Sequence, residues 1–355
     1  MPKIDVLFRK VITGKGSDLH LQQGRCPRIR INGLLCEVEG ESALTGEDIK
    51  ELLLEIATKE SWSVFEKTGD VDFAYSLGNE GRFRVNFYRN FFGLGAVFRL
   101  IPSRIVSLKD LDMPASLKTL TELQSGLVLV TGPTGSGKST TLAALIDHIN
   151  RTKLKKIVTI EEPVEFMHAN QRSIITHREV GLDTESFSSG LRGAIKSDAE
   201  IILVGEMRDR ETTMLALTAA QMGILVFGTL HTNSAAKTVD RVVDMFSANQ
   251  KQQVRTILAN TLQGIVSQQL LRSADGTRRW SACEILLKSV ALTSILMEGD
   301  VAKLVSEIQT GRGKGMVLLD DSLLDLVRTG KVTKEEAYMK ALNKSIFSAT
   351  PGGSV

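Results

Sequence analysis

One short segment, residues 132–139, carries the pattern G-x-x-x-x-G-K-[S/T] in full, which is typical of loops that bind phosphate groups. Its glycines let the backbone fold tightly, so that successive N–H groups can point at a phosphate. Lys138 can reach the β- and γ-phosphates of a nucleotide, and the Ser139 hydroxyl can bind Mg²⁺. We therefore expect Mg-ATP to be bound by eight residues: Gly132, Thr134, Gly135, Ser136, Gly137, Lys138, Ser139 and Thr140.

The segment also lies in the context that this chemistry requires. A predicted strand, 126–130, precedes it, and a predicted helix, 140–149, follows it, so that the positive end of the helix faces the phosphates. A plain strand–turn–helix corner is the alternative interpretation. The full match to the pattern, between a strand and a helix, argues against that alternative.

Carboxylates follow two other predicted strands. The apolar strand 201–204 is followed by Gly205 and Glu206, and the apolar strand 157–160 by the acidic segment 161–165. The carboxyl ends of parallel strands share one edge of a sheet, where ligands bind, so these acids should lie near the phosphate loop. We expect Glu206 to orient or activate the attacking water. A surface ion pair between Glu206 and Arg208 is the alternative.

The acidic segment holds two further candidates. Glu162 and Glu165 can hold Mg²⁺ through water or share the role of base, although a solvated acidic turn explains them as well. His231 follows the predicted strand 223–227, which makes it a third group at a strand end that could contact the γ-phosphate. The other histidines are given a structural interpretation.

Composition places these motifs in an ordinary globular protein. The chain has 355 residues, 42% hydrophobic and 24% charged, which suggests two domains and rules against wholesale disorder. A net charge of +3 gives no argument for binding nucleic acid, and we expect none. The three cysteines form no C-x-x-C pair, which favours a reducing compartment and argues against a zinc module. We find no apolar run long enough to span a membrane.

The first predicted domain, residues 1–101, combines helices with antiparallel strands. Helical spacing of apolar residues covers 4–12, and a capping pattern at Thr45 begins a second helix over 49–56. Alternation predicts strands at 70–77, 82–88 and 96–101, with a turn at 78–81. Helices should cover one face of this sheet. Residues 102–115 are predicted to be the linker.

The second predicted domain alternates buried strands with helices, which favours a parallel sheet covered by helices. Its ATPase core is predicted over 116–272, with apolar strands at 126–130, 156–160, 201–204 and 224–227. After about residue 246 the pattern turns helical, with one stripe running from Val254 toward Leu271. We expect 273–355 to be a helical extension with helices at 289–297, 300–309, 317–329 and 334–342, and a frayed tail from 345.

Four motifs together resemble a known family. The phosphate loop, the acidic segment 161–165, the stretch 202–209 and the stretch 228–233 are similar in order and spacing to the Walker A, Asp-box, Walker B and His-box motifs of type II/IV secretion ATPases. The PilT-like type IV pilus retraction ATPases are the most similar branch. Supporting stretches lie at 81–86, 95–103, 217–220, 236–244 and 308–311.

The resemblance implies a fold, an assembly and a location. The fold is α/β, with a PAS-like α+β N-terminal domain, a RecA-like P-loop ATPase domain and a helical C-terminal extension. The assembly is a homohexameric ring that uses ATP and Mg²⁺ to power pilus retraction and twitching motility. It acts in the cytoplasm, at the inner face of the inner membrane, with an inner-membrane pilus platform protein as partner.

The resemblance also assigns roles to residues. Glu206 resembles the catalytic Walker B glutamate, Glu165 the catalytic glutamate of the Asp box, and His231 the His-box residue. Arg84 and Arg99 match arginines that reach a nucleotide from the neighbouring domain or subunit. A solvated strand face is the alternative interpretation of these two arginines.

Two departures from the family pattern bear on function. Glu162 stands where the Asp box usually has Asp, and Thr293 and Met297 stand where an arginine-bearing segment usually lies, here 291–297. The second departure questions the coupling of hydrolysis to retraction and makes a paralogous retraction ATPase a candidate partner. Two alternatives remain beside the retraction motor. One is an accessory PilT-like paralogue that binds ATP in a motor ring, and the other is a pilus-assembly or type II secretion ATPase.

Overall fold

The computed structural model of the chain describes residues 2–31, 33–78, 80–101 and 105–348. They divide into two compact units. The first is Met1–Arg104 with Pro163–Met167, and the second is Ile105–Glu162 with His168–Val355. Pro102 to Arg104 of the predicted linker, Asn79 of the predicted turn and 349–355 of the predicted tail lie outside the described residues. Residues 105–115 cluster with the second unit.

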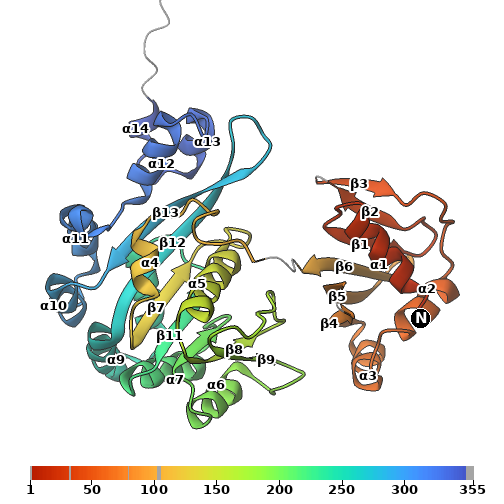
Figure 1. Cartoon of the computed structure of the whole chain (residues 1–355), viewed down its shortest axis with the longest axis horizontal. Helices are drawn as coiled ribbons and strands as arrows, with labels where there is room; N and C mark the ends of the chain where they lie inside the picture. Colours follow the sequence, from red (N-terminus) through yellow and green to blue (C-terminus); the bar gives the residue numbers. More distant parts are fainter. Residues whose placement is uncertain (1, 32, 79, 102–104, 349–355) are drawn as a thin grey trace, which may run out of the picture. The chain divides into compact units, whose positions relative to one another are not determined.

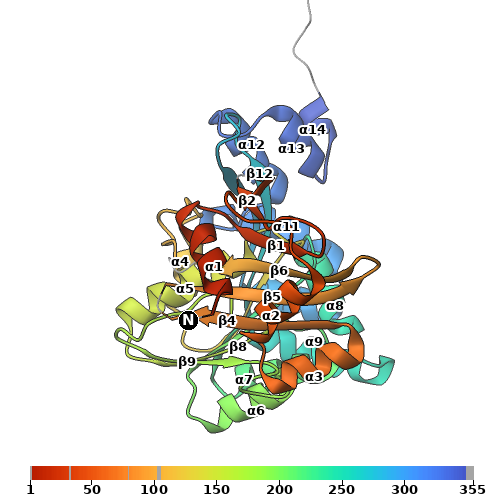
Figure 2. The ribbon, with the colours of Figure 1, turned by 90° about the vertical axis from the view of Figure 1, so that its right-hand side faces the viewer.

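The first unit is an antiparallel sheet of six strands with three helices (Figures 1 and 2). The strand order is β3-β2-β1-β6-β5-β4. The elements are α1 (Ile4–Thr13), β1 (Asp18–Gln22), β2 (Arg28–Ile31), β3 (Leu34–Glu37), α2 (Gly46–Leu54), α3 (Lys59–Thr68), β4 (Asp70–Leu77), β5 (Gly81–Asn90) and β6 (Gly93–Ile101). The expected helices and the three expected strands are confirmed, including the capping box at Thr45. The short strands β1, β2 and β3 were not predicted.

Alternation along the strands separates an apolar face from a polar face. On β5, Phe83, Val85 and Phe87 are fully buried, whereas Arg84 between them is exposed. Phe8 of α1 stacks on Phe83 with ring centroids 4.3 Å apart. One face of the sheet therefore carries the aromatic core and the opposite face carries charged side chains.

The second unit contains a sheet of seven strands, in the order β13-β12-β7-β11-β10-β8-β9. All neighbouring strands are parallel except β12 and β13. The strands are β7 (Gly126–Thr131), β8 (Lys156–Glu161), β9 (Ile174–Glu179), β10 (Ile201–Val204), β11 (Leu225–Leu230), β12 (Leu262–Arg272) and β13 (Arg279–Leu287). β7 lies between β12 and β11, so the phosphate loop that follows it emerges from the interior of the sheet.

Helices cover both faces of this sheet (Figure 1). Leu127 and Leu129 of β7 belong to one core cluster, with residues of α6, α7, α8 and α9, whereas Val128 and Val130 belong to another, with residues of α4 and α5. These helices are α4 (Ser116–Leu120), α5 (Lys138–Thr152), α6 (Phe187–Lys196), α7 (Arg210–Gln221), α8 (Ala235–Asp244) and α9 (Ala248–Thr261). The expected parallel sheet covered by helices is confirmed.

The prediction of helical structure is wrong for 262–272 and 279–287, which are strands. The helical stripe from Val254 ends with α9 at Thr261, and β12 and β13 then join the sheet. A register shift between Leu262 and Gly264 breaks the alternation that would have revealed β12. The apolar residues of 262–271 are spaced by three and four, as in a helix, so the sequence predicted a helix there. The segment forms a strand because it pairs with β7.

Most of the remaining elements confirm the helices expected after residue 289. The remaining elements are α10 (Val290–Glu298), η1 (Val301–Lys303), α11 (Leu304–Thr310), η2 (Gly311–Lys314), α12 (Leu319–Arg328), α13 (Lys334–Lys340) and α14 (Ser345–Ser348). The expected frayed tail from 345 is wrong for residues 345–348, which form a further helix, because Phe347 is 4% exposed and packs in a core cluster. Helices α12 to α14 form a separate core cluster with Leu271 and Ala282 of β12 and β13. Among the described residues, no helix has the length and apolar character needed to cross a membrane.

The aromatic core gives a stability prediction for the first unit. Phe8→Ala should lower its free energy of unfolding by about 3–5 kcal/mol, because the fully buried ring leaves a cavity against Phe83. Urea unfolding followed by Trp62 fluorescence, in a Trp280→Phe background, would measure it. The control is Val6→Ala on the same helix, where the side chain is 50% exposed and the cost should stay below about 1 kcal/mol. Equal losses in both variants would contradict the assigned core.

Candidate nucleotide-binding site

The phosphate loop connects β7 to α5, and its conformation depends on glycine. Gly132, Gly135 and Gly137 have φ values of +147°, +77° and +88°. A Cβ at Gly132 would lie 2.3 Å from the backbone oxygen of Gln268, and one at Gly137 would lie 2.8 Å from its Nε2. All three positive φ angles favour glycine, and at Gly132 the close backbone of β12 also excludes a Cβ.

Two side chains of the loop fit a phosphate ligand. Lys138 is only 9% exposed, and its Nζ donates to the carbonyl oxygens of Gly132 at 2.9 Å and Pro133 at 3.1 Å, so the ammonium lies within the loop. Ser136 is 3% exposed, and its Oγ has no hydrogen-bond partner among the described residues. A buried hydroxyl without a partner is costly, and a phosphate oxygen would satisfy it.

The carboxylate of Glu206 follows β10 and is held from two sides. Its Oε2 lies 2.8 Å from a guanidinium nitrogen of Arg208, and its Oε1 lies 3.1 Å from Nε2 of His231. Burial acts to raise the pKa of Glu206, but the hydrogen bond and charge of Arg208, with a smaller effect of His231, outweigh it and lower the pKa. The ion pair with Arg208 is thus present, and it holds an ionised carboxylate at the strand end.

The register of the strands explains why these groups meet. Val204 of β10 pairs with Ile160 of β8 on one side and with Gly228 of β11 on the other. The residues after each strand therefore emerge at the same edge. Arg208 also reaches Glu162, with a nitrogen–oxygen distance of 3.3 Å. The expected grouping of Glu206, His231 and Glu162 is present in the structure.

Three other candidate residues belong to the first unit. Glu165 is exposed and lies in Pro163–Met167, which clusters with that unit. Arg84 and Arg99 are directly opposite each other on β5 and β6, and both are exposed. The structure thus brings the two arginines together on the polar face of the sheet. The roles of all three in catalysis stay predictions.

Each of these arginines has a carboxylate partner. Arg84 lies 2.9 Å from Asp72, and Nε of Arg99 lies 2.9 Å from Asp18. Asp18 is nearly buried, and burial acts to raise its pKa, but hydrogen bonds from Ser17 and Arg99 outweigh that effect and lower it. The alternative interpretation, a solvated polar face, describes these contacts as well.

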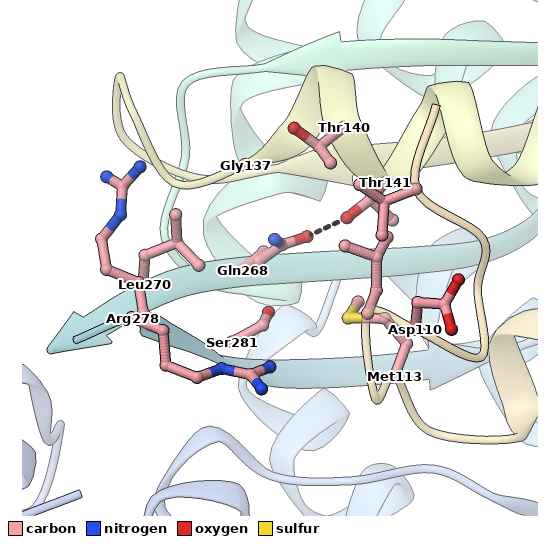
Figure 3. Close-up of a pocket in the computed structure, with 12 residues that line it drawn as sticks. Asp110, Met113, Gly137, Thr140, Thr141, Gln268, Leu270, Arg278 and Ser281 are labelled. Carbon is pink, nitrogen blue, oxygen red and sulfur yellow. Dashed lines mark hydrogen bonds between the residues drawn. The ribbon is translucent and has the colours of Figure 1, made fainter. Parts of the chain in front are cut away.

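A cavity of about 340 Å³ lies beside the start of α5 and was not predicted from the sequence (Figure 3). Gly137, Thr140 and Thr141 line one side, and Leu270 and Arg278 line another. Gln268 of β12 points toward α5, where its Oε1 accepts a hydrogen bond of 2.8 Å from Thr141 (Figure 3). Gly137 and Thr140 were expected in the site from the phosphate-loop pattern, whereas no sequence signal marked Gln268 and Leu270, because 262–272 matched a helix.

A glycine-rich phosphate loop in the interior of a mainly parallel sheet, with carboxylates after the neighbouring strands, defines a P-loop ATPase of the RecA-like class. The sequence profile of the family "Type II/IV secretion system protein" matches residues 1–337, and the chain belongs to this family.

Three relatives show where in the family the similarity lies. The chain is 46% identical over 325 residues to a type IV pilus retraction ATPase, PilT, from Pseudomonas aeruginosa, which covers 92% of this chain and 94% of that protein. It is 34% identical over 339 residues to the type IV pilus ATPase PilU of the same organism, covering 96% and 88%. The crystal structure of the pilus retraction motor PilT with bound ADP superposes with a TM-score of 0.90 at 38% identity, covering 97% and 98%. The resemblance to PilT-like ATPases is therefore confirmed.

The contacts of Glu206 predict the effect of removing its charge. Glu206→Gln should keep nucleotide binding within about twofold and lower kcat by about 100-fold or more, because an amide cannot accept a proton from water. Titration with a fluorescent ATP analogue and a phosphate-release assay would measure the two quantities. Glu211→Gln is the control: it removes an exposed acid of α7 that is paired with Arg192 of α6, and it should leave both quantities unchanged. Hydrolysis by Glu206→Gln at the rate of the unmodified protein would show that the assignment is wrong.

Proposed function

We propose that this chain is a Mg²⁺-dependent homohexameric ATPase that powers type IV pilus retraction, and with it twitching motility. The observation that carries the proposal is that the phosphate loop and the group holding Glu206 begin side by side: the Gly132 N–H donates to the carbonyl of Leu230, and the next residue, His231, contacts Glu206. Similarity to a named pilus retraction ATPase over 92% of the chain supports the biological role.

The residues of the second unit divide the work of binding ATP. The phosphates would be bound by the loop from Gly132 to Thr140, with Lys138 and the Ser136 hydroxyl as charged and polar partners. The base and ribose would occupy the cavity next to Gly137 and Leu270, because it opens directly beside the loop. Glu206 would take the proton of the attacking water, since its carboxylate is ionised and fixed in orientation.

Mg²⁺ would be held chiefly by the phosphates, with Ser139 and Glu162 as the protein's contributions. Hydroxyl and carboxylate oxygens are the ligands that this ion prefers. Among the described residues there is no group of three or more histidine, cysteine or acidic side chains that could hold a metal alone, which agrees with binding through the nucleotide. When bound, the ion neutralises charge on the phosphates.

The arginines of the first unit would complete the site of a neighbouring domain or subunit, with Glu165 acting as a further catalytic carboxylate. The exposed positions of Arg84 and Arg99, side by side on one sheet face, support a role at a boundary. An exposed ion pair such as Arg84–Asp72 contributes little stability, so it can be exchanged for a phosphate at small cost.

This arrangement predicts complementation between two inactive variants. Arg84→Ala should bind a fluorescent ATP analogue but hydrolyse poorly, and Lys138→Ala should not hydrolyse ATP at all. Mixing the two should recover part of the activity, because a ring containing both can form an intact composite site. Arg28→Ala, which removes a similar pair with Glu37, is the control and should be fully active. Full activity of both Arg84→Ala and Arg99→Ala would overturn the composite site.

The partners and location follow from the proposed role. We propose that the ring works in the cytoplasm at the inner face of the inner membrane, on a pilus platform protein of that membrane. A paralogous retraction ATPase is a further proposed partner. Its basis is that the chain is similar to both PilT and PilU of a single organism.

Helix α10 supports dependence on such a paralogue. Thr293 and Met297 stand at the two places where an arginine is usual in the PilT-like pattern. The Thr293 hydroxyl donates back to the carbonyl of Ser289 at 3.2 Å, and Met297 is 39% exposed. Neither side chain can replace a guanidinium in pairing with a carboxylate. We therefore expect normal hydrolysis with weak retraction.

A twitching assay tests this expectation. In a strain lacking all retraction ATPases, the gene alone should restore little motility, and Thr293→Arg with Met297→Arg should restore more. Val290→Arg with Ser294→Arg adds the same charge to other exposed positions of α10 and is the control, which should not help. Full motility from the unmodified gene would contradict dependence on a paralogue. Loss of ATP hydrolysis by the purified protein would instead favour the accessory, ATP-binding role.

A further inference from the structure

A row of buried polar side chains crosses three neighbouring strands beneath α8. Thr131 ends β7, Ser267 pairs with it on β12, and Glu284 pairs with Ser267 on β13. All three are at least nine-tenths buried, with exposures of 0%, 2% and 4%. The Oγ1 of Thr131 lies 2.7 Å from the Oγ of Ser267. The row begins directly before the phosphate loop, because Gly132 follows Thr131.

The first turn of α8 is bonded to both ends of this row. The backbone N–H of Ala235, the first residue of α8, donates to Oε1 of Glu284 at 2.6 Å. The hydroxyl of Thr238 lies 3.4 Å from Oγ1 of Thr131, and Thr238 is 0% exposed. The start of α8 is therefore fixed by contacts with β7 and β13, on either side of β12.

Thr238 also connects this row to the segment that carries His231. Its Oγ1 donates to the carbonyl of Ser234 at 2.7 Å and lies 2.7 Å from the Oγ1 of Thr232. Thr238 is also the donor in its contact with Thr131, and a hydroxyl has one proton, so it donates either to Ser234 or to Thr131. In both cases Thr232 donates the bond that joins it to Thr238. Thr232 is adjacent to His231, whose Nε2 contacts Glu206.

We propose that Thr238 is a positioning residue of the nucleotide site, which couples the start of the phosphate loop at Thr131 to His231 through Thr232. The inference rests on the proposed hydrolysis of ATP at this site. It goes further by assigning a role to a side chain that touches neither the phosphate loop's glycines nor Glu206. When the phosphate loop moves Thr131, the hydrogen bond between Thr131 and Thr238 changes. Thr238 then shifts the segment 231–234 through its bonds to Thr232 and Ser234.

The burial of the connected hydroxyl groups of Thr131, Ser267 and Thr238 supports a role for Thr238 beyond packing. Interior hydroxyls that bond to one another strengthen each other at low dielectric, and a missing member leaves partners unsatisfied. Replacing Thr238 by valine would keep the shape and remove the hydroxyl from three contacts. Replacing it by serine would keep the hydroxyl and remove only a methyl group. The pair of variants separates the hydrogen bonds from packing.

The test uses the full-length protein. Thr238→Val should lower kcat by about tenfold, with the Kd for a fluorescent ATP analogue changed by less than about twofold, and Thr238→Ser should retain at least about half of kcat. In a His231→Ala background, Thr238→Val should have no further effect on kcat, because it acts through His231. Thr213→Val, at another fully buried threonine on α7, is the matched control and should leave kcat unchanged.

A second readout does not need hydrolysis. Hydrogen–deuterium exchange of the 230–240 segment should slow when ADP binds, in the unmodified protein and in Thr238→Ser, but not in Thr238→Val. An equal response to ADP in all three proteins would overturn the proposal, as would a Thr238→Val effect that persists undiminished without His231. Absence of hydrolysis by the unmodified protein would instead overturn the proposed function, while the exchange measurement would still decide the role of Thr238.

Discussion

The site depends first on the register of the buried parallel strands. Val204 pairs with Ile160 and Gly228, and Thr131 pairs with Leu230, so four strands deliver their following residues to one edge of the sheet. A slip of one residue would turn the side chains of a strand to its other face. Because both faces of these strands are buried against helices, the register has little freedom. The chemistry at the edge is thus positioned by apolar packing several residues away.

Features that a short local segment determines could be predicted from the sequence. Features that depend on contacts between segments far apart in the sequence could not. The phosphate loop, Glu206 and His231 each follow a strand that a short continuous apolar run reveals, so the sequence alone could place them at strand ends. Gln268 could not be placed in this way, because the irregular register near Gly264 made β12 match a helix. Without β12 there was no way to anticipate the cavity beside α5 or the partner of Thr131. Gln268 and Ser267 of β12, which contact Thr141 and Thr131 beside the phosphate loop, carried no local sequence signal.

The ion pairs of Glu206 differ in burial from those of Arg84 and Arg99. Glu206 is only 18% exposed and shared between Arg208 and His231, so its orientation is fixed from both sides. Arg84 has an exposed partner, Asp72, whereas Arg99 is bonded to the nearly buried Asp18. An exposed pair is exchanged at less cost than one with a desolvated carboxylate. The Arg99–Asp18 pair is therefore costlier to break than the Arg84–Asp72 pair.

Glu284 shows how the site reaches the C-terminal helices. Burial raises the pKa of this carboxyl, against the opposing effect of hydrogen bonds from the backbone N–H groups of Ala235 and Leu319. These residues begin α8 and α12, so one side chain of β13 holds the first turn of both helices. Ser322 of α12 also accepts a bond from the Cys283 backbone at 3.1 Å. The first turns of α8 and α12 are therefore joined through β13 by the side chain of Glu284. These contacts of Glu284 and Cys283 do not involve α10, where Thr293 and Met297 lie.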